Sequence, residues 1–174
     1  YIHDNAPYCV SIALRNKSEL LLGVVYDPCL DECFYAWKGG GAYLNGQSLQ
    51  VSSVRSMEAS FVVTELPYNS EQYARTGEYL IRELYGRVAG IRMNGSAAIA
   101  LCYVAAGRFD AWLEAFLGKW DFSAAALIVQ EAGGRVTDFY GNAGFIDGHH
   151  VVATNGWLHP FLLELVQKAM PLGM

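Results

Sequence analysis

The stretch LGKWDFSAAALIVQEAGGRVTD, residues 117–138, decides the fold of this chain. It joins an acid, Asp121, to a run of small apolar residues, a double glycine and a segment that is typical of a strand. Small side chains at 124–126 let a helix lie close to a sheet, and Gly133 suits the left-handed position that ends a helix. Aspartate is a preferred N-cap, because its carboxylate accepts a backbone N–H of the first turn. The stretch therefore predicts a buried helix that begins at Asp121 and leads into a strand.

Segments with strand and helix patterns alternate from residue 60 onward. The predicted strands are 60–66, 87–93, 108–114, 134–139 and 149–155, and the predicted helices are 70–86, 95–107 and 157–170. The second helix is apolar nearly all round, so we expect it to be buried on every side. This alternation predicts an α/β layer with a mixed sheet.

Residues 8–53 have another pattern. Two apolar runs, 10–14 and 20–26, are joined by polar residues and predict a hairpin, which 33–40 extends by a third strand. Asn45 and Gly46 form a tight-turn signal. We therefore predict an antiparallel meander. Because the first two runs are almost continuously apolar, we expect its sheet to be well covered.

The two patterns divide the chain. We predict that residues 1–56 are the antiparallel sheet portion of a truncated N-terminal subdomain and that residues 57–174 are a C-terminal α/β subdomain. The chain begins at Tyr1 inside a polar loop, and we expect it to be part of a larger protein.

Composition excludes several classes of protein. The net charge is −5 and the positive residues are scattered, so we expect no nucleic-acid partner. No apolar run approaches the roughly 20 residues that span a bilayer, so we expect no membrane partner. Cys29 and Cys33 are close in sequence, but no second pair completes a zinc set, and we expect reduced thiols. Without a targeting segment, we expect a cytoplasmic protein.

Two acids and a helix start fall at matching places in the predicted sheet. Glu114 ends a strand seven residues before Asp121, and Gly95, Ser96 and Ala97 follow another strand where a helix begins. Ligands of α/β sheets collect beyond the carboxyl ends of strands, and free amides at a helix start attract an oxyanion. The arrangement suits a divalent cation with a phosphate ester. The alternative is that Asp121 only caps its helix.

Several segments also resemble a known family in the same order. WDFSAAALIVQEAGG resembles the signature near the C-terminus of the inositol monophosphatase family, and YIHDNAPYCVSIAL, GVVYDP, KGGGAYLNGQSLQVS and IRMNGSAAIALCYVAAGRFDAWLE resemble other family segments. The resemblance covers essentially the whole chain. It implies part of an αβαβα sugar-phosphatase fold, of which this chain is about the C-terminal two-thirds.

The resemblance also implies an activity. Family members are Mg²⁺-dependent phosphoric monoester hydrolases in which a metal-activated water attacks the phosphorus, and the implied substrate is a polyol phosphate such as inositol monophosphate. Asp121 matches a metal-ligating, catalytic aspartate that also meets the substrate. Gly95, Ser96 and Ala97 match a segment whose backbone meets the substrate, and Glu114 matches an acid that binds the polyol hydroxyls. The implied assembly is a homodimer.

The family's other metal carboxylates and its catalytic threonine match nothing in this chain and are expected upstream of Tyr1. We therefore expect the chain alone to be inactive and to expose apolar surface of the meander that upstream helices would cover. Asp110, Glu131 and Asp138 match no family ligand and are interpreted as surface or capping acids. The alternatives for the whole protein are a fructose-bisphosphatase, an adenosine-bisphosphate nucleotidase, or a non-catalytic module that keeps the fold.

Overall fold

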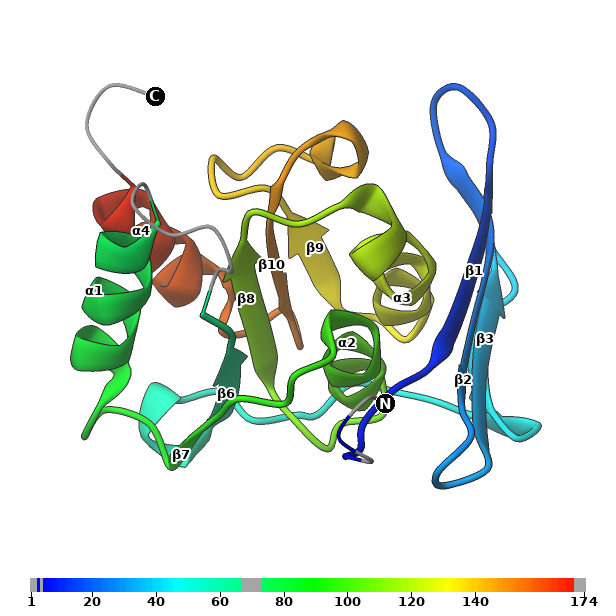
Figure 1. Ribbon diagram of the computed structural model, residues 1–174, viewed down its shortest axis with the longest axis horizontal. Helices are drawn as coiled ribbons and strands as arrows, with labels where there is room; N and C mark the ends of the chain where they lie inside the picture. Colours follow the sequence, from blue (N-terminus) through cyan, green and yellow to red (C-terminus); the bar gives the residue numbers. More distant parts are fainter. Residues whose placement is uncertain (1–2, 4, 67–72, 171–174) are drawn as a thin grey trace.

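The first sheet of the protein is the predicted meander. The computed structural model describes residues 3, 5–66 and 73–170, and it arranges them in layers (Figure 1). The first five strands form an antiparallel sheet in chain order: β1 (Val10–Arg15), β2 (Leu20–Asp27), β3 (Glu32–Trp37), β4 (Ala42–Leu44) and β5 (Gln47–Ser48). Asn45 and Gly46 have φ angles of 48° and 84°, as a two-residue turn between antiparallel strands requires. The predicted meander is confirmed.

The second sheet is mixed, as the sequence predicts. Its order is β7-β6-β8-β10-β9, where the strands are β6 (Phe61–Thr64), β7 (Gly90–Arg92), β8 (Ala111–Ala115), β9 (Arg135–Thr137) and β10 (His150–Thr154). Strand β6 runs parallel to β7 and β8, whereas β10 runs antiparallel to β8 and β9. The parallel strands β6 and β8 therefore have their carboxyl ends on the same side of the sheet. The site described below lies at these ends.

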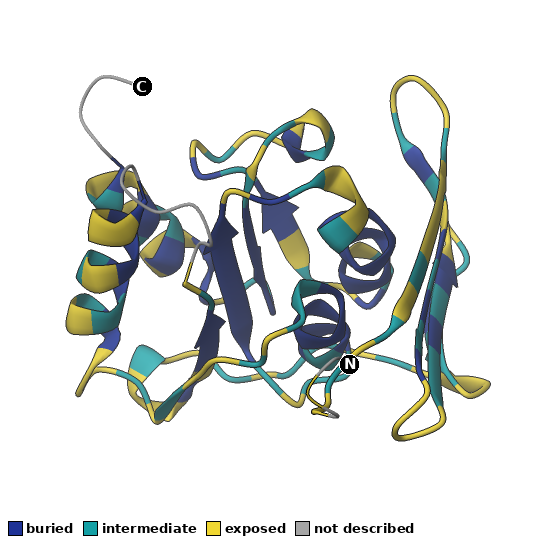
Figure 2. Cartoon of the chain, viewed as in Figure 1, coloured by how far each residue is buried: buried dark blue, intermediate teal, exposed yellow. Residues whose placement is uncertain are grey.

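The helices lie in two layers. Helices α2 (Ala97–Ala105) and α3 (Lys119–Glu131) lie between the two sheets, whereas α1 (Ala74–Leu84) and α4 (His159–Ala169) cover the far face of the second sheet (Figure 1). Short 3₁₀ helices stand at Met57–Ala59 (η1) and Phe145–Asp147 (η2). The inner helices are buried on nearly every side (Figure 2), as their apolar sequences predict. Residues 70–72, at the predicted start of α1, lie outside the described residues.

Helix α3 begins two residues earlier than predicted. Gly118 is its N-cap, and Asp121 occupies the third helical position, from which Oδ2 accepts the Gly118 N–H at 2.9 Å. Asp121 therefore caps the helix by reaching back. The small residues act as predicted, because a Cβ on Gly23 of β2 would lie 2.3 Å from the Ala124 oxygen. Gly133 follows the helix with φ 88°.

The first sheet is covered on one face only. Its inner face packs Val25 and Phe34 against α2 and α3. On the other face Val10, Ile12 and Leu14 are each more than half exposed. The apolar surface that we expect the meander of this chain to expose is therefore present. The expectation of a well covered sheet holds for the inner face only, because alternate side chains of each strand face opposite ways and only one face meets the described helices.

Asp110 is not a surface acid. It is buried between β6 and the segment before η1, where its carboxylate accepts hydrogen bonds from the Ser52 hydroxyl and from the Phe61 N–H at 2.7 Å. Glu131 and Asp138 do cap backbone amides, in the loop at 39–41 and in the turn at 138–142.

All four cysteines are free, as predicted. Among the described residues, none of the helices is long and apolar enough to cross a membrane. The division of the chain after residue 56 stays a prediction.

Candidate active site

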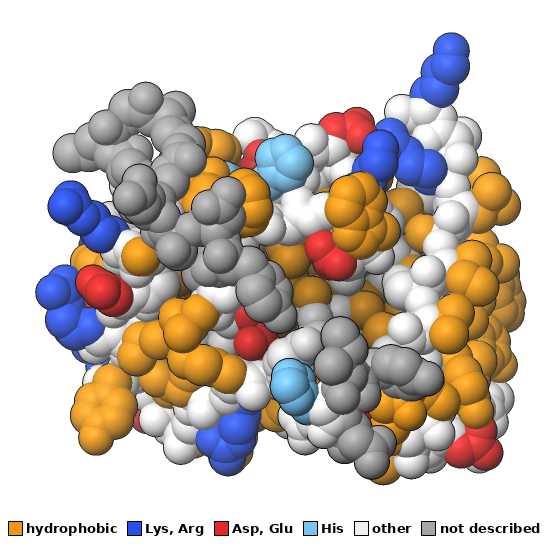
Figure 3. Space-filling view, viewed as in Figure 1, with side chains coloured by type: hydrophobic (Ala, Val, Ile, Leu, Met, Phe, Trp, Pro, Cys, Tyr) orange, Lys and Arg blue, Asp and Glu red, His pale blue; other side chains and the backbone are white. Residues whose placement is uncertain are grey.

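A cavity of about 530 Å³ opens where β6 and β8 end and α2 and α3 begin. It brings together all five residues that the sequence singles out, with its lining made of Pro7, Tyr8, Cys9, Ser11, Glu65, Leu66, Gly95, Ser96, Ala97, Ala98, Glu114, Phe116, Leu117, Trp120 and Asp121. The volume is that of a small-molecule site. In Figure 3, acidic and hydrophobic side chains lie side by side near the middle of the face turned to the reader.

Glu114 is the most deeply buried acid of the cavity. It lies on β8, whose five residues are all buried, and only 8% of its surface is exposed. Burial raises the pKa of its carboxyl group to about 8, and the charges of Glu65 and Asp121 add to this effect. Its Oε2 has no hydrogen-bond partner among the described residues. At neutral pH Glu114 is therefore mostly protonated, and it can both donate to and accept from a hydroxyl group.

One carboxylate oxygen of Asp121 accepts a hydrogen bond, and the other accepts none from the described residues. Oδ2 accepts the Gly118 N–H, while no described residue donates to Oδ1. A carboxylate oxygen is the donor that Mg²⁺ prefers, so Asp121 fits the role of one metal ligand. Among the described residues, however, no three His, Cys, Asp or Glu side chains lie close enough to hold a metal ion together. The described residues therefore do not form a complete metal site by themselves, and the role of Asp121 as a metal ligand stays a prediction.

The start of α2 forms another wall of the cavity. Ser96 is the N-cap of α2, and its hydroxyl accepts the Ile99 N–H at 3.5 Å. No described residue accepts the N–H of Ser96 or of Ala97, and these amides can meet an anionic oxygen. The amide of Gly95 is not free as expected, because it donates to Oε1 of Glu65 at 2.8 Å.

Glu65 is the acid that sequence reasoning missed. It follows β6 directly, and its carboxylate accepts the amides of Asn94 and Gly95. Strands β6 and β8 are parallel, and Thr64 lies opposite Leu113. Glu65 therefore comes next to Glu114 at the carboxyl ends of these two strands. The available signal was an acid at the end of a short buried strand, the same signal that identified Glu114.

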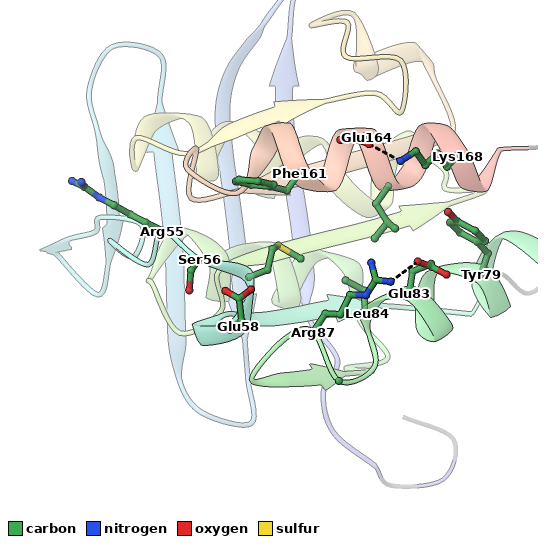
Figure 4. Close-up of a pocket in the computed structure, with 13 residues that line it drawn as sticks. Arg55, Ser56, Glu58, Tyr79, Glu83, Leu84, Arg87, Phe161, Glu164 and Lys168 are labelled. Carbon is green, nitrogen blue, oxygen red and sulfur yellow. Dashed lines mark hydrogen bonds and ion pairs between the residues drawn. The ribbon is translucent and has the colours of Figure 1, made fainter.

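A second cavity, of about 520 Å³, lies on the outer side of the second sheet between α1 and α4 (Figure 4). None of the predicted site residues lines it. Its charged side chains include two ion pairs along the helices, Glu83 with Arg87 and Glu164 with Lys168. The two charges within each pair neutralise each other, so charge of one sign does not accumulate in this cavity.

The chain belongs to the inositol monophosphatase family, whose model matches residues 1–170. The fold agrees, because the structure of inositol monophosphatase from Anabaena (Nostoc) sp. PCC 7120 superimposes with a TM-score of 0.90 at 32% identity over 98% of this chain and 68% of that one.

Two curated relatives carry different names. The Nus factor SuhB of Pseudomonas aeruginosa is 43% identical over 98% of this chain, and the inositol-1-monophosphatase of Rhizobium meliloti is 36% identical over 98% of it. The chain spans 64% of the length of each.

Proposed function

We propose that the whole protein is a Mg²⁺-dependent phosphoric monoester hydrolase that acts on a polyol phosphate such as inositol monophosphate. The observation that carries the proposal is the single cavity that unites Asp121, Glu114 and the free amides at the start of α2. The relative named inositol-1-monophosphatase supports the substrate class.

Each wall of the cavity has a separate task in this proposal. Asp121 would hold the metal ion, which when bound polarises phosphate oxygens and lowers the pKa of its water. The amides of Ser96 and Ala97, together with the dipole of α2, orient the anionic ester. Glu114 binds a hydroxyl of the alcohol, because its protonated carboxyl group has both a donor and an acceptor.

Phosphate release by the full-length gene product tests the proposal. We expect the highest kcat/KM on inositol monophosphate, compared with fructose bisphosphate and adenosine bisphosphate, and loss of turnover when a chelator removes Mg²⁺. A preference for either bisphosphate would assign the protein to one of the two related activities. Turnover that survives the chelator would contradict the metal requirement.

The 174-residue chain alone is expected to release no phosphate above the background without protein. The reason is the ligand count, since Asp121 offers one carboxylate whereas each Mg²⁺ takes about six oxygens. The same assay, with Mg²⁺ in excess, measures this, and turnover by the isolated chain would show that its own residues complete the metal site.

A second candidate is a non-catalytic module that keeps the fold, and the relative named Nus factor SuhB carries a name that states no phosphatase activity. Against a direct nucleic-acid role of this chain stand its net charge of −5 and its scattered positive residues. The phosphate-release assay separates the candidates, because a non-catalytic module would turn over none of the three esters.

A further inference from the structure

Two large aromatic side chains stand at the cavity with much of their surface exposed. Phe116 is 47% exposed and Trp120 is 73% exposed, and both line the cavity that contains Glu114 and Asp121. An exposed apolar group beside convergent polar groups is typical of a surface that meets a ligand. The role proposed above for Asp121, Glu114 and α2 uses neither ring.

The backbone at Phe116 is held in an unfavourable conformation. Its φ angle is 65°, in the left-handed region that a bulky residue rarely adopts. The Phe116 N–H donates to Nδ1 of His150 at 3.3 Å, and its ring centroid lies 5.6 Å from that of Tyr73. These contacts fix the ring immediately after the strand that carries Glu114, although a glycine would fit the backbone there better.

The indole of Trp120 depends on a glycine for its place. A Cβ on Gly118 would lie 2.3 Å from Cε2 of Trp120, so the ring rests directly on the Gly118 backbone. Gly118 is also the residue whose N–H binds Asp121. The exposed indole is therefore positioned by the same turn that positions the proposed metal ligand, one residue before it.

We propose that Phe116 and Trp120 form an aromatic wall that selects the alcohol part of the ester, favouring a ring-shaped alcohol over an acyclic one. This inference rests on the proposed function. A ring presents a rigid C–H face that can pack on an aromatic face while its hydroxyl groups reach Glu114. An acyclic alcohol offers no such face and loses more conformational freedom on binding.

NMR titration of the full-length gene product, kept free of Mg²⁺ so that neither ester is hydrolysed, tests the aromatic wall, with myo-inositol 1-phosphate and glycerol 2-phosphate as probes. We expect the inositol ester to shift the indole N–H signal of Trp120 and to bind about tenfold more tightly than the glycerol ester. Phe116→Gly and Trp120→Ala should each weaken binding of the inositol ester about fivefold and leave binding of the glycerol ester within about twofold. Gly at position 116 keeps the left-handed backbone, so the variant removes only the ring.

Trp157→Ala is the matched control, since this half-exposed tryptophan stacks on Arg55 and does not line the cavity. It should leave the affinity for both esters unchanged. Equal affinity for the two esters, or an unchanged preference in Phe116→Gly and Trp120→Ala, would overturn the aromatic wall while phosphate release still supports the proposed function. Failure of both esters to shift any cavity signal would also overturn it, and the release assay judges the proposed function separately.

Discussion

Replacing Glu114 by glutamine is expected to stabilise the chain at alkaline pH and to leave its stability nearly unchanged near pH 4. Burial first, and then the charges of Glu65 and Asp121, raise the pKa of Glu114 from 4.5 to about 8 in the folded state. Between these values the folded chain keeps a proton that the unfolded chain releases. The free energy of unfolding therefore falls as pH rises through this window. Since one pKa unit corresponds to about 1.4 kcal/mol, the loss approaches roughly 5 kcal/mol above pH 8.

Urea unfolding of Glu114→Gln and of the unchanged chain at pH 4, 7 and 9 measures this difference. Glutamine keeps the shape of the side chain and cannot ionise, so the variant lacks the alkaline penalty. Glu78→Gln is the control, because Glu78 is exposed on α1 and should give the same small difference at every pH. A difference between Glu114→Gln and the unchanged chain that does not grow from pH 4 to pH 9 would contradict the buried, protonated state of Glu114.

The elements that the sequence predicted best are those whose own residue pattern determines their environment, whichever segments they contact. Helix α2 is apolar nearly all round, so its burial between two layers followed without any partner being known. The Asn45–Gly46 turn followed from backbone sterics. The start of α3 was missed by two residues because Gly118, which has no side chain to signal a cap, takes the N-cap position and Asp121 reaches back to it.

Pairings between distant segments could not be predicted. His159 was uninformative in the sequence, yet it is fully buried, and its ring nitrogens lie 3.0 Å and 3.1 Å from the hydroxyl oxygens of Thr137 and Thr154. Burial lowers its pKa to about 4. Asp110 is likewise buried, and its carboxylate accepts a hydrogen bond from the hydroxyl of Ser52, which lies 58 residues away in the sequence. In both cases the sequence shows one polar residue, and only the fold supplies its partners.

The candidate site was predicted as far as strand ends and helix starts are visible in a sequence. Glu114, Asp121 and the start of α2 line one cavity. Glu65 follows a short buried strand as Glu114 ends one, and what the sequence does not show is the parallel register of β6 and β8 that brings the two acids together. The occupied amide of Gly95 follows from the same register, which brings the Glu65 carboxylate to the loop before α2. Register between non-adjacent strands is set by tertiary packing, and the sequence pattern does not contain it.

Asp121→Asn is expected to lower kcat/KM for inositol monophosphate at least about 100-fold in the full-length gene product, a loss of roughly 3 kcal/mol of transition-state stabilisation. Asparagine retains a side-chain oxygen that can accept the Gly118 N–H, so the turn and the start of α3 should persist. What it lacks is the negative charge that strengthens the binding of a divalent cation. Loss of the charge beside the helix dipole should cost only about 0.3–1 kcal/mol of stability. Asp121→Asn should therefore lower the activity far more than it lowers the stability of the fold.

Phosphate release over a range of Mg²⁺ concentrations measures this effect together with the expected rise in the Mg²⁺ concentration that gives half-maximal rate. Asp147→Asn is the matched control, because Asp147 is an exposed acid that pairs with Arg15 and does not line the cavity. Its kcat/KM and its Mg²⁺ dependence should stay close to those of the unchanged protein. Retention of activity within about threefold by Asp121→Asn, a change of less than 1 kcal/mol, would show that the carboxylate only caps α3 and that the metal is held elsewhere.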